Sequence, residues 1–202
     1  MLTEFLERSE VTELCELRSR FGIMAYHGGN LERTTDAVAG EVARRTDASF
    51  YAVLQDPPHR NHIASIQFDP AHSLALSQFL EHVDIVITVH GYGRRRLLRH
   101  LLLGGRNREL AGHVARHLRE GLPRRYHVLD DIDAIPKDLR GQHPRNPVNR
   151  PPKQGVQIEL PPSIRWNVKE WGWSDHEGVS RTRDVDRLID ALSAAVKSWP
   201  AA

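Results

Sequence analysis

The chain has little of what several classes of protein require. Its 202 residues include one cysteine, Cys15, which excludes an internal disulfide framework and any metal site built from several thiolates. Its apolar runs are only strand-length, and its first residues carry acids where a signal peptide needs a basic region followed by an apolar one. We therefore expect a cytoplasmic protein without a membrane partner, in which a bound metal is held by histidines and carboxylates.

Charge of one sign is lacking too. The 28 lysines and arginines nearly balance the 26 aspartates and glutamates, so the net charge of +2 does not indicate a nucleic-acid partner. Because no internal repeat and no break in composition divides the chain, we expect a single domain over residues 1–202. The unusual feature of the composition is its twelve histidines.

Apolar strands and amphipathic helices alternate along the chain. Strands are predicted at residues 21–27, 49–55, 62–68, 84–90, 126–131 and 155–160, and helices at residues 2–20, 31–46, 71–83, 107–122 and 181–199. A strand, a helix and a strand at this spacing indicate a right-handed crossover between parallel strands. The order predicts a three-layer α/β fold with a mixed, mostly parallel sheet flanked by helices. In such folds, ligands bind beyond the carboxyl ends of the strands.

Two of the predicted strands end in His-Gly, at His27 and at His90. The glycines that follow leave room for the backbone to turn beside a small object such as an ion. Glu32 is expected in the first turn of the next helix, from where its carboxylate can fold back toward His27. Two imidazoles and one carboxylate form a catalytic zinc set with a fourth position for water or substrate. We therefore predict Zn²⁺ as the cofactor, with His27, Glu32 and His90 as its ligands.

A catalytic base is predicted on the strand "GVQIEL". Its apolar residues alternate with Gln157 and Glu159, so one face is expected to be core and the other polar. A carboxylate on a buried strand is costly unless it is paired or close to a metal. We predict that Glu159 takes the proton of the attacking water and returns it to the leaving amine.

Basic and amide side chains are expected near the opening of the predicted metal site. Arg106 belongs to the basic segment that follows His90, and Asn149 and Arg150 come from the proline-rich loop before the Glu159 strand. The guanidinium fork suits carboxylates, so we predict that these three residues bind an acidic substrate.

Each pattern has an alternative interpretation. A histidine at a strand end beside glycine is also typical of a core group with a satisfied hydrogen bond. His113 and His117 have metal-ligand spacing on a helix, but no glutamate follows the first of them, and we interpret this pair as a solvated helix face. The arginine-rich run at residues 94–99 leaves a nucleic-acid-binding accessory protein open as a rival function. A second rival is a zinc deacylase of an N-acyl amino acid, which shares the metal chemistry but needs a closed pocket instead of an open groove. The run lacks the interleaved aromatic residues typical of single-strand binding, which makes nucleic acid the weaker alternative.

Five motifs in order, "HGGNLE", "VHGYG", "GGRN", "NPVNR" and "GVQIEL", resemble the poly-γ-glutamate hydrolase family, which is associated with bacteriophages and bacterial genomes. The resemblance implies a zinc carboxypeptidase-like α/β fold, one catalytic zinc and hydrolysis of a γ-linked glutamate polymer. By motif, His27, Glu32 and His90 match the family's zinc ligands and Glu159 its general base. The segment "NHIASIQFD" resembles the family's segment between the ligand strands, and this resemblance places His62 and Ser65 near the site. The arginine run and the long proline loop resemble a bacterial subgroup.

Overall fold

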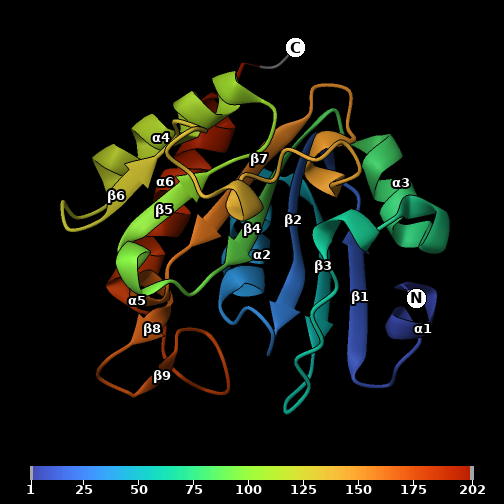
Figure 1. Cartoon of the computed structure of the whole chain (residues 1–202), viewed down its shortest axis with the longest axis horizontal. Coiled ribbons are helices and arrows are strands. Elements are labelled where there is room, and N and C mark those ends of the chain that lie inside the picture. The colour runs from blue at the N-terminus through green and yellow to red at the C-terminus, as the bar shows by residue number, and fades with distance from the viewer. Residues whose placement is uncertain (1, 201–202) are drawn as a thin grey trace.

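The strands of the chain form one seven-stranded sheet in the order β1-β3-β2-β4-β7-β5-β6, in a computed structural model that describes residues 2–200 (Figure 1). The strands are β1 (Val11–Glu16), β2 (Ser19–Gly29), β3 (Ala48–Gln55), β4 (Ile85–Gly91), β5 (His100–Leu103), β6 (His127–Leu129) and β7 (Gly155–Leu160). Strands β3, β2, β4 and β7 run parallel, as do β5 and β6. Strand β1 is antiparallel to β3, and β5 is antiparallel to β7. The predicted mixed, mostly parallel sheet is therefore confirmed.

Helices cover both faces of this sheet. They are α1 (Leu2–Leu6), α2 (Thr35–Thr46), α3 (Leu74–His82), α4 (Arg108–Gly121), α5 (Pro162–Arg165) and α6 (Arg183–Ser198). Helices α2, α4 and α6 share one apolar cluster with residues such as Ile23 and Ile87, whereas α1 and α3 share another with Met24 and Val86. Successive strand residues thus enter opposite clusters, which gives the three layers seen in Figure 1.

The predicted helix at residues 2–20 is wrong beyond Leu6, because Val11–Glu16 forms the edge strand β1. Leu14 packs against one apolar cluster and Cys15 against the other, a two-residue alternation that the loose pattern of apolar residues did not make clear. The Tyr51 hydroxyl on β3 donates to Glu13 at 2.6 Å and adds a side-chain tie between the two strands.

The strand predicted at residues 62–68 is also wrong. This segment is irregular apart from a 3₁₀ turn over Ser65–Gln67, since Gln67 N–H bonds locally to the Ala64 carbonyl rather than to a neighbouring strand. Strand β5 was missed inside the basic segment, although its three leucines, 101 to 103, are fully buried. Two further short strands, β8 (Trp166–Asn167) and β9 (Gly172–Trp173), pair with each other.

The proline-rich segment before β7 is ordered. Its 3₁₀ turn, Pro147–Asn149, is buried, and Val148 packs in the cluster that contains α3. Within residues 2–200, none of the helices combines the length and the apolar character that crossing a bilayer demands.

Candidate metal centre

The two strand-end histidines and Glu32 converge at the carboxyl edge of the sheet. His27 lies near the carboxyl end of β2 and His90 near the carboxyl end of β4, and these strands are parallel neighbours. Glu32 lies in the turn before α2 rather than in its first helical turn, because the helix begins at Thr35. That turn is closed by Glu32 N–H donating to the His27 carbonyl at 2.9 Å. Two residues that are 58 positions apart in sequence, Glu32 and His90, are thereby brought into contact.

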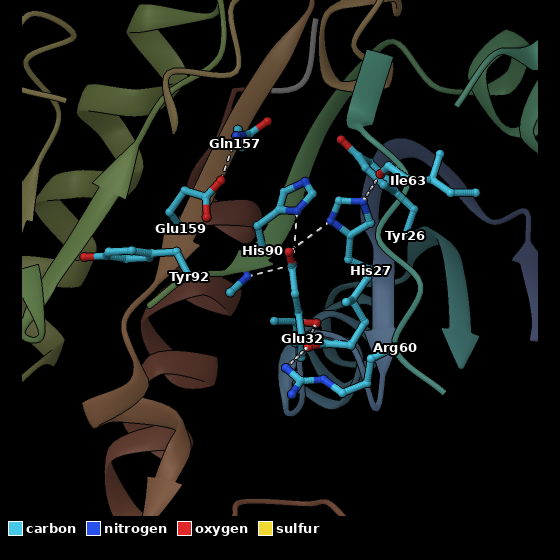
Figure 2. Close-up of polar contacts among 12 residues, drawn as sticks. Tyr26, His27, Glu32, Arg60, Ile63, His90, Tyr92, Gln157 and Glu159 are labelled. Atoms are coloured by element: carbon cyan, nitrogen blue, oxygen red, sulfur yellow. Dashed lines mark hydrogen bonds and ion pairs between the residues drawn. The ribbon is translucent and has the colours of Figure 1, made fainter. Parts of the chain in front are cut away.

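The Glu32 carboxylate bridges the two imidazoles (Figure 2). Its Oε1 lies 3.0 Å from His27 Nδ1, and its Oε2 lies 3.2 Å from His90 Nδ1. The Gly91 backbone N–H also donates to Oε2 at 2.8 Å. One donor atom from each of the three side chains lies within 4.8 Å of the other two. This is the compact arrangement that a single ion needs.

The surroundings favour the nitrogens that face Glu32 as metal ligands. His27 Nε2 lies 2.8 Å from the Ile63 carbonyl, which can only accept, so Nε2 carries the proton and Nδ1 presents its lone pair. Burial opposes every charge here, yet the Glu32 carboxylate raises the pKa of His27, and the two imidazoles hold the pKa of Glu32 well below its usual range. His90 Nε2 is buried without a hydrogen-bond partner among the described residues. A carboxylate whose two oxygens each face an imidazole nitrogen fits a divalent cation.

Glu159 stands on the strand beside this centre. It is the register partner of His90 across β4 and β7, and only 5% of it is exposed. Its Oε1 accepts from Gln157 Nε2 at 2.8 Å, and Gln157 Oε1 accepts from Asn146 Nδ2 at 2.9 Å. Burial raises the pKa of Glu159 to about 7, an effect that His90 opposes and the Glu32 charge reinforces. The group is therefore poised to exchange a proton near neutral pH.

The expected polar face of β7 is thus not solvated, because all six residues of the strand are buried. Gln157 and Glu159 instead face a cleft of about 500 Å³. Its lining includes the three candidate ligands, His62, Ser65, Tyr92, Lys137 and part of the segment 139–146. A larger cleft of about 660 Å³ lies beside the start of α6, but no histidine lines it among the described residues.

The predicted substrate residues Arg106, Asn149 and Arg150 are not among the residues that line the metal cleft. The Asn149 side-chain amide donates to the Gly141 and His143 carbonyls at 2.7 and 2.9 Å. Its Oδ1 accepts from the Arg106 backbone N–H at 3.0 Å, and the Arg106 guanidinium donates to the Gln142 carbonyl at 2.9 Å. These contacts hold the cleft wall from behind, and direct substrate binding by the three residues stays a prediction.

The histidine pair on α4 is not a solvated face as interpreted from its sequence. His113 Nε2 lies 2.9 Å from the Ala195 carbonyl of α6, and its ring contacts Trp199 at 5.1 Å between centroids. His117 Nε2 lies 3.0 Å from the Ser198 hydroxyl, so both histidines contact the end of α6, and neither lines the metal cleft.

Arg165 is a neighbour of the centre that the sequence reasoning missed. It ends α5 with 5% exposure, and its guanidinium lies where a Gly91 side chain would be, with Cζ 2.6 Å from the position of an added Cβ. Gly91 is thus required for space, whereas Gly29, at φ +63°, is required by the turn itself. An arginine between Ile164 and Trp166, directly after the Glu159 strand, was the available signal.

Known proteins resemble this chain in sequence and in fold. A family model described as poly-gamma-glutamate hydrolase matches residues 7–191. The SPbeta prophage-derived UPF0714 protein YoqZ of Bacillus subtilis (strain 168) is 34% identical over 93 residues, which cover 46% of this chain and 32% of that protein. The matched segment therefore spans about a third of that relative's length.

Solved structures share the fold. A bacteriophage poly-gamma-glutamate hydrolase superposes with a TM-score of 0.79 at 21% identity, covering 95% of this chain and 91% of that one. A zinc-free apo form of YNDL superposes with a TM-score of 0.74 at 20% identity, over 98% and 94% of the two chains. N-formylglutamate amidohydrolase from Ralstonia eutropha JMP134 gives 0.54 at 14% identity, over 94% and 96%. These structures share the predicted α/β fold.

Proposed function

We propose, from the premise that the chain belongs to the poly-gamma-glutamate hydrolase family and is thus an amide-bond hydrolase, that it cleaves γ-glutamyl amide bonds of an acidic peptide or polymer. The proposed site of cleavage is the centre formed by His27, Glu32 and His90. The observation that carries the proposal is the convergence of two imidazole Nδ1 atoms on one carboxylate, beside a second, buried carboxyl group. We further propose that residues 1–202 act as one domain.

Zinc is the metal that we propose for the three ligands. Two imidazoles and one carboxylate are a catalytic zinc set, and the similar protein YNDL, which has a zinc-free apo form, supports the same metal. When bound, zinc would supply a water of pKa about 7 and polarise the carbonyl of the substrate. The Ile63 carbonyl and the Gly91 N–H would orient His27 and Glu32 for that role.

Glu159 is the proposed general base. Its Oε1 is held by Gln157, and no hydrogen bond within residues 2–200 reaches Oε2, which leaves Oε2 to accept the proton of the attacking water. The same oxygen then returns the proton to the nitrogen of the departing amine. A pKa of about 7 suits both directions of transfer at neutral pH.

Arg106 and Asn149 are proposed to act on the substrate indirectly. They brace the wall that presents Gln142 and His143 to the cleft, through the hydrogen bonds described above. Arg150 Nη2 lies 3.6 Å from Asp69 and ties the same loop to the segment before α3.

Three substrates test the proposed function. Zinc-loaded protein is incubated with poly-γ-glutamate, poly-α-glutamate and N-acetylglutamate, and newly formed amines are measured together with polymer size. We expect amines from poly-γ-glutamate alone. Release from N-acetylglutamate alone would favour the zinc deacylase, and no release from any substrate would refute the proposal. Salt-dependent DNA binding that persists in His90→Ala, without any hydrolysis, would favour the nucleic-acid-binding accessory protein.

A further inference from the structure

A second, smaller recess of about 200 Å³ opens beside the metal cleft. The two hollows share Glu32, Gly91 and Tyr92 as lining residues, so the recess begins at the centre itself. Its other lining residues include three arginines and one tryptophan: Arg33, Arg60, Arg165 and Trp173. Figure 2 shows Arg60 beside Glu32, on the side of that residue away from Glu159.

The three arginines bring more positive charge than the recess balances. Arg33 donates to the Asn30 side-chain carbonyl, Arg60 to the Leu31 carbonyl, and Arg165 to the carbonyls of Arg33 and Tyr92. All of these acceptors are neutral, and none of the three guanidiniums is in a salt bridge within residues 2–200. Among the described residues, Glu32 is the only carboxylate in the lining, and both of its oxygens already contact the imidazoles.

Arg165 is the most constrained of the three. It is 5% exposed, and its Nε is buried without a hydrogen-bond partner among the described residues. Burial lowers the pKa of Arg165 to about 10, which the charges of Glu32 and Glu159 oppose, so the group stays cationic at neutral pH. Trp173 lies under its guanidinium at 4.9 Å from the ring centroid. A buried cation without a salt bridge is costly, and its retention beside the centre indicates that it serves a ligand.

Backbone and side chains of the "HGGNLER" segment hold the other two arginines at the rim. Asn30 is buried and receives Arg33 on its Oδ1, while its Nδ2 donates to the His59 carbonyl at 3.0 Å. One side chain thus positions Arg33 and anchors the segment that carries Arg60. The recess is therefore a built site rather than a chance gathering of surface charges.

We propose that this recess binds the α-carboxylate of the glutamate on the leaving-amine side of the scissile bond, an inference that rests on the proposed function. In a γ-linked polymer this carboxylate is two bonds from the amide nitrogen, whereas in an α-linked polymer the free carboxylate of the same residue lies at the far end of its side chain. Because the recess shares Glu32 and Gly91 with the centre, it suits a carboxylate close to the reacting bond. Its volume is below the roughly 300–1,000 Å³ of pockets for drug-sized ligands and fits a single residue. The recess thereby selects γ-linked over α-linked substrates.

A double-mutant cycle between protein and ligand tests this inference. Zinc-loaded Glu159→Gln protein, in which turnover is suppressed, is titrated calorimetrically with γ-glutamylglutamate and with γ-glutamyl-isoglutamine, whose leaving-side α-carboxylate is an amide. We expect γ-glutamyl-isoglutamine to bind at least about tenfold more weakly than γ-glutamylglutamate. We also expect Arg60→Gln to lower the affinity for γ-glutamylglutamate by at least about tenfold without lowering the affinity for γ-glutamyl-isoglutamine further. Arg165→Lys, which keeps the charge but loses the forked guanidinium, is expected to lower the affinity for γ-glutamylglutamate as well.

Arg95→Gln is the matched control, because Arg95 is exposed and lies outside both hollows. We expect its affinity for γ-glutamylglutamate to stay within about twofold of the parent. Three results would each overturn the proposed recess. Arg60→Gln could weaken the binding of both ligands to the same extent, Arg95→Gln could weaken the binding of γ-glutamylglutamate as much as Arg60→Gln does, or the Glu159→Gln protein could bind neither ligand. If hydrolysis is absent while the cycle holds, the proposed function fails and the recess remains.

Discussion

His90 and Glu159 are register partners on the parallel strands β4 and β7. Because parallel neighbours in register project corresponding side chains from the same level of the sheet, an imidazole and a buried carboxyl group leave adjacent strands side by side. His90 turns its Nδ1 to Glu32, and Glu159 is held by Gln157. One strand pair thus carries both a metal ligand and the proposed base, and the two roles can be separated by mutation.

Metal binding is expected to depend on the three converging side chains. His27→Ala removes one of the nitrogens that face Glu32, so we expect the purified variant to lose bound zinc, as measured by elemental analysis after dialysis. His62→Ala is the control, because His62 lines the same cleft but is not part of the group of three. Equal zinc in His27→Ala and the unsubstituted protein would rule out this ligand set.

Glu159→Gln is expected to separate metal binding from turnover. The amide keeps the shape of the side chain but cannot accept the proton of the attacking water, so we expect full zinc content and a loss in kcat of at least about a hundredfold. Glu41→Gln removes a carboxylate on α2 that does not line the cleft, and it should leave kcat unchanged. Unchanged turnover in Glu159→Gln would assign the base to another group.

Gly91→Ala is expected to damage both the fold and the recess. The new Cβ would lie 2.6 Å from Arg165 Cζ, so the buried guanidinium must move, at a cost of about 1–3 kcal/mol in the free energy of unfolding. Gly112→Ala on α4 is the control, because an added Cβ there meets nothing within 4 Å and should stabilise the helix by about 0.5–1 kcal/mol. Urea denaturation measures both, and an unaltered midpoint in Gly91→Ala would contradict the packing described here.

The metal-free protein is expected to lose stability as pH rises through the range in which Glu159 ionises. The pKa of Glu159 rises on folding from its ordinary 4.5 to about 7, so between these values the folded state holds a proton that the unfolded chain has released. The unfolding free energy therefore falls across this window, by up to about 3 kcal/mol at about 1.4 kcal/mol per pH unit.

Glu159→Gln isolates this contribution. The amide does not titrate, so the variant should lose less stability than the unsubstituted protein between pH 4.5 and 7.5, measured by urea denaturation with a chelator present. The pKa of His27 is also raised on folding, and its contribution is likewise lost as pH rises, but it is present in both proteins. Parallel stability curves for the two proteins would show that Glu159 titrates normally.

Much of the centre was predictable because its parts are local. The strands predicted to end at His27 and His90 and the strand around Glu159 are continuous apolar runs. Their predicted boundaries lie within one residue of β4 and β7, whereas β2 extends two residues further at each end. Edge strand β1 was mistaken for helix, because polar residues interrupt its few apolar ones and hide in the sequence the two-residue alternation that the packing shows. The segment at 62–68 has strand-like residues but no neighbouring strand to pair with.

By itself the sequence determined the alternation of strands and helices and the candidates His27, Glu32, His90 and Glu159, since each depends on spacing between near neighbours in the chain. Tertiary structure alone decided that Arg165 fills the space beside Gly91, that Asn149 braces a wall instead of lining the cleft, and that three arginines share one recess. The physical reason is that such roles depend on contacts of a few ångströms between groups on different segments. These contacts form when strands that are 60 or more residues apart in sequence pair, and no local sequence pattern contains that information.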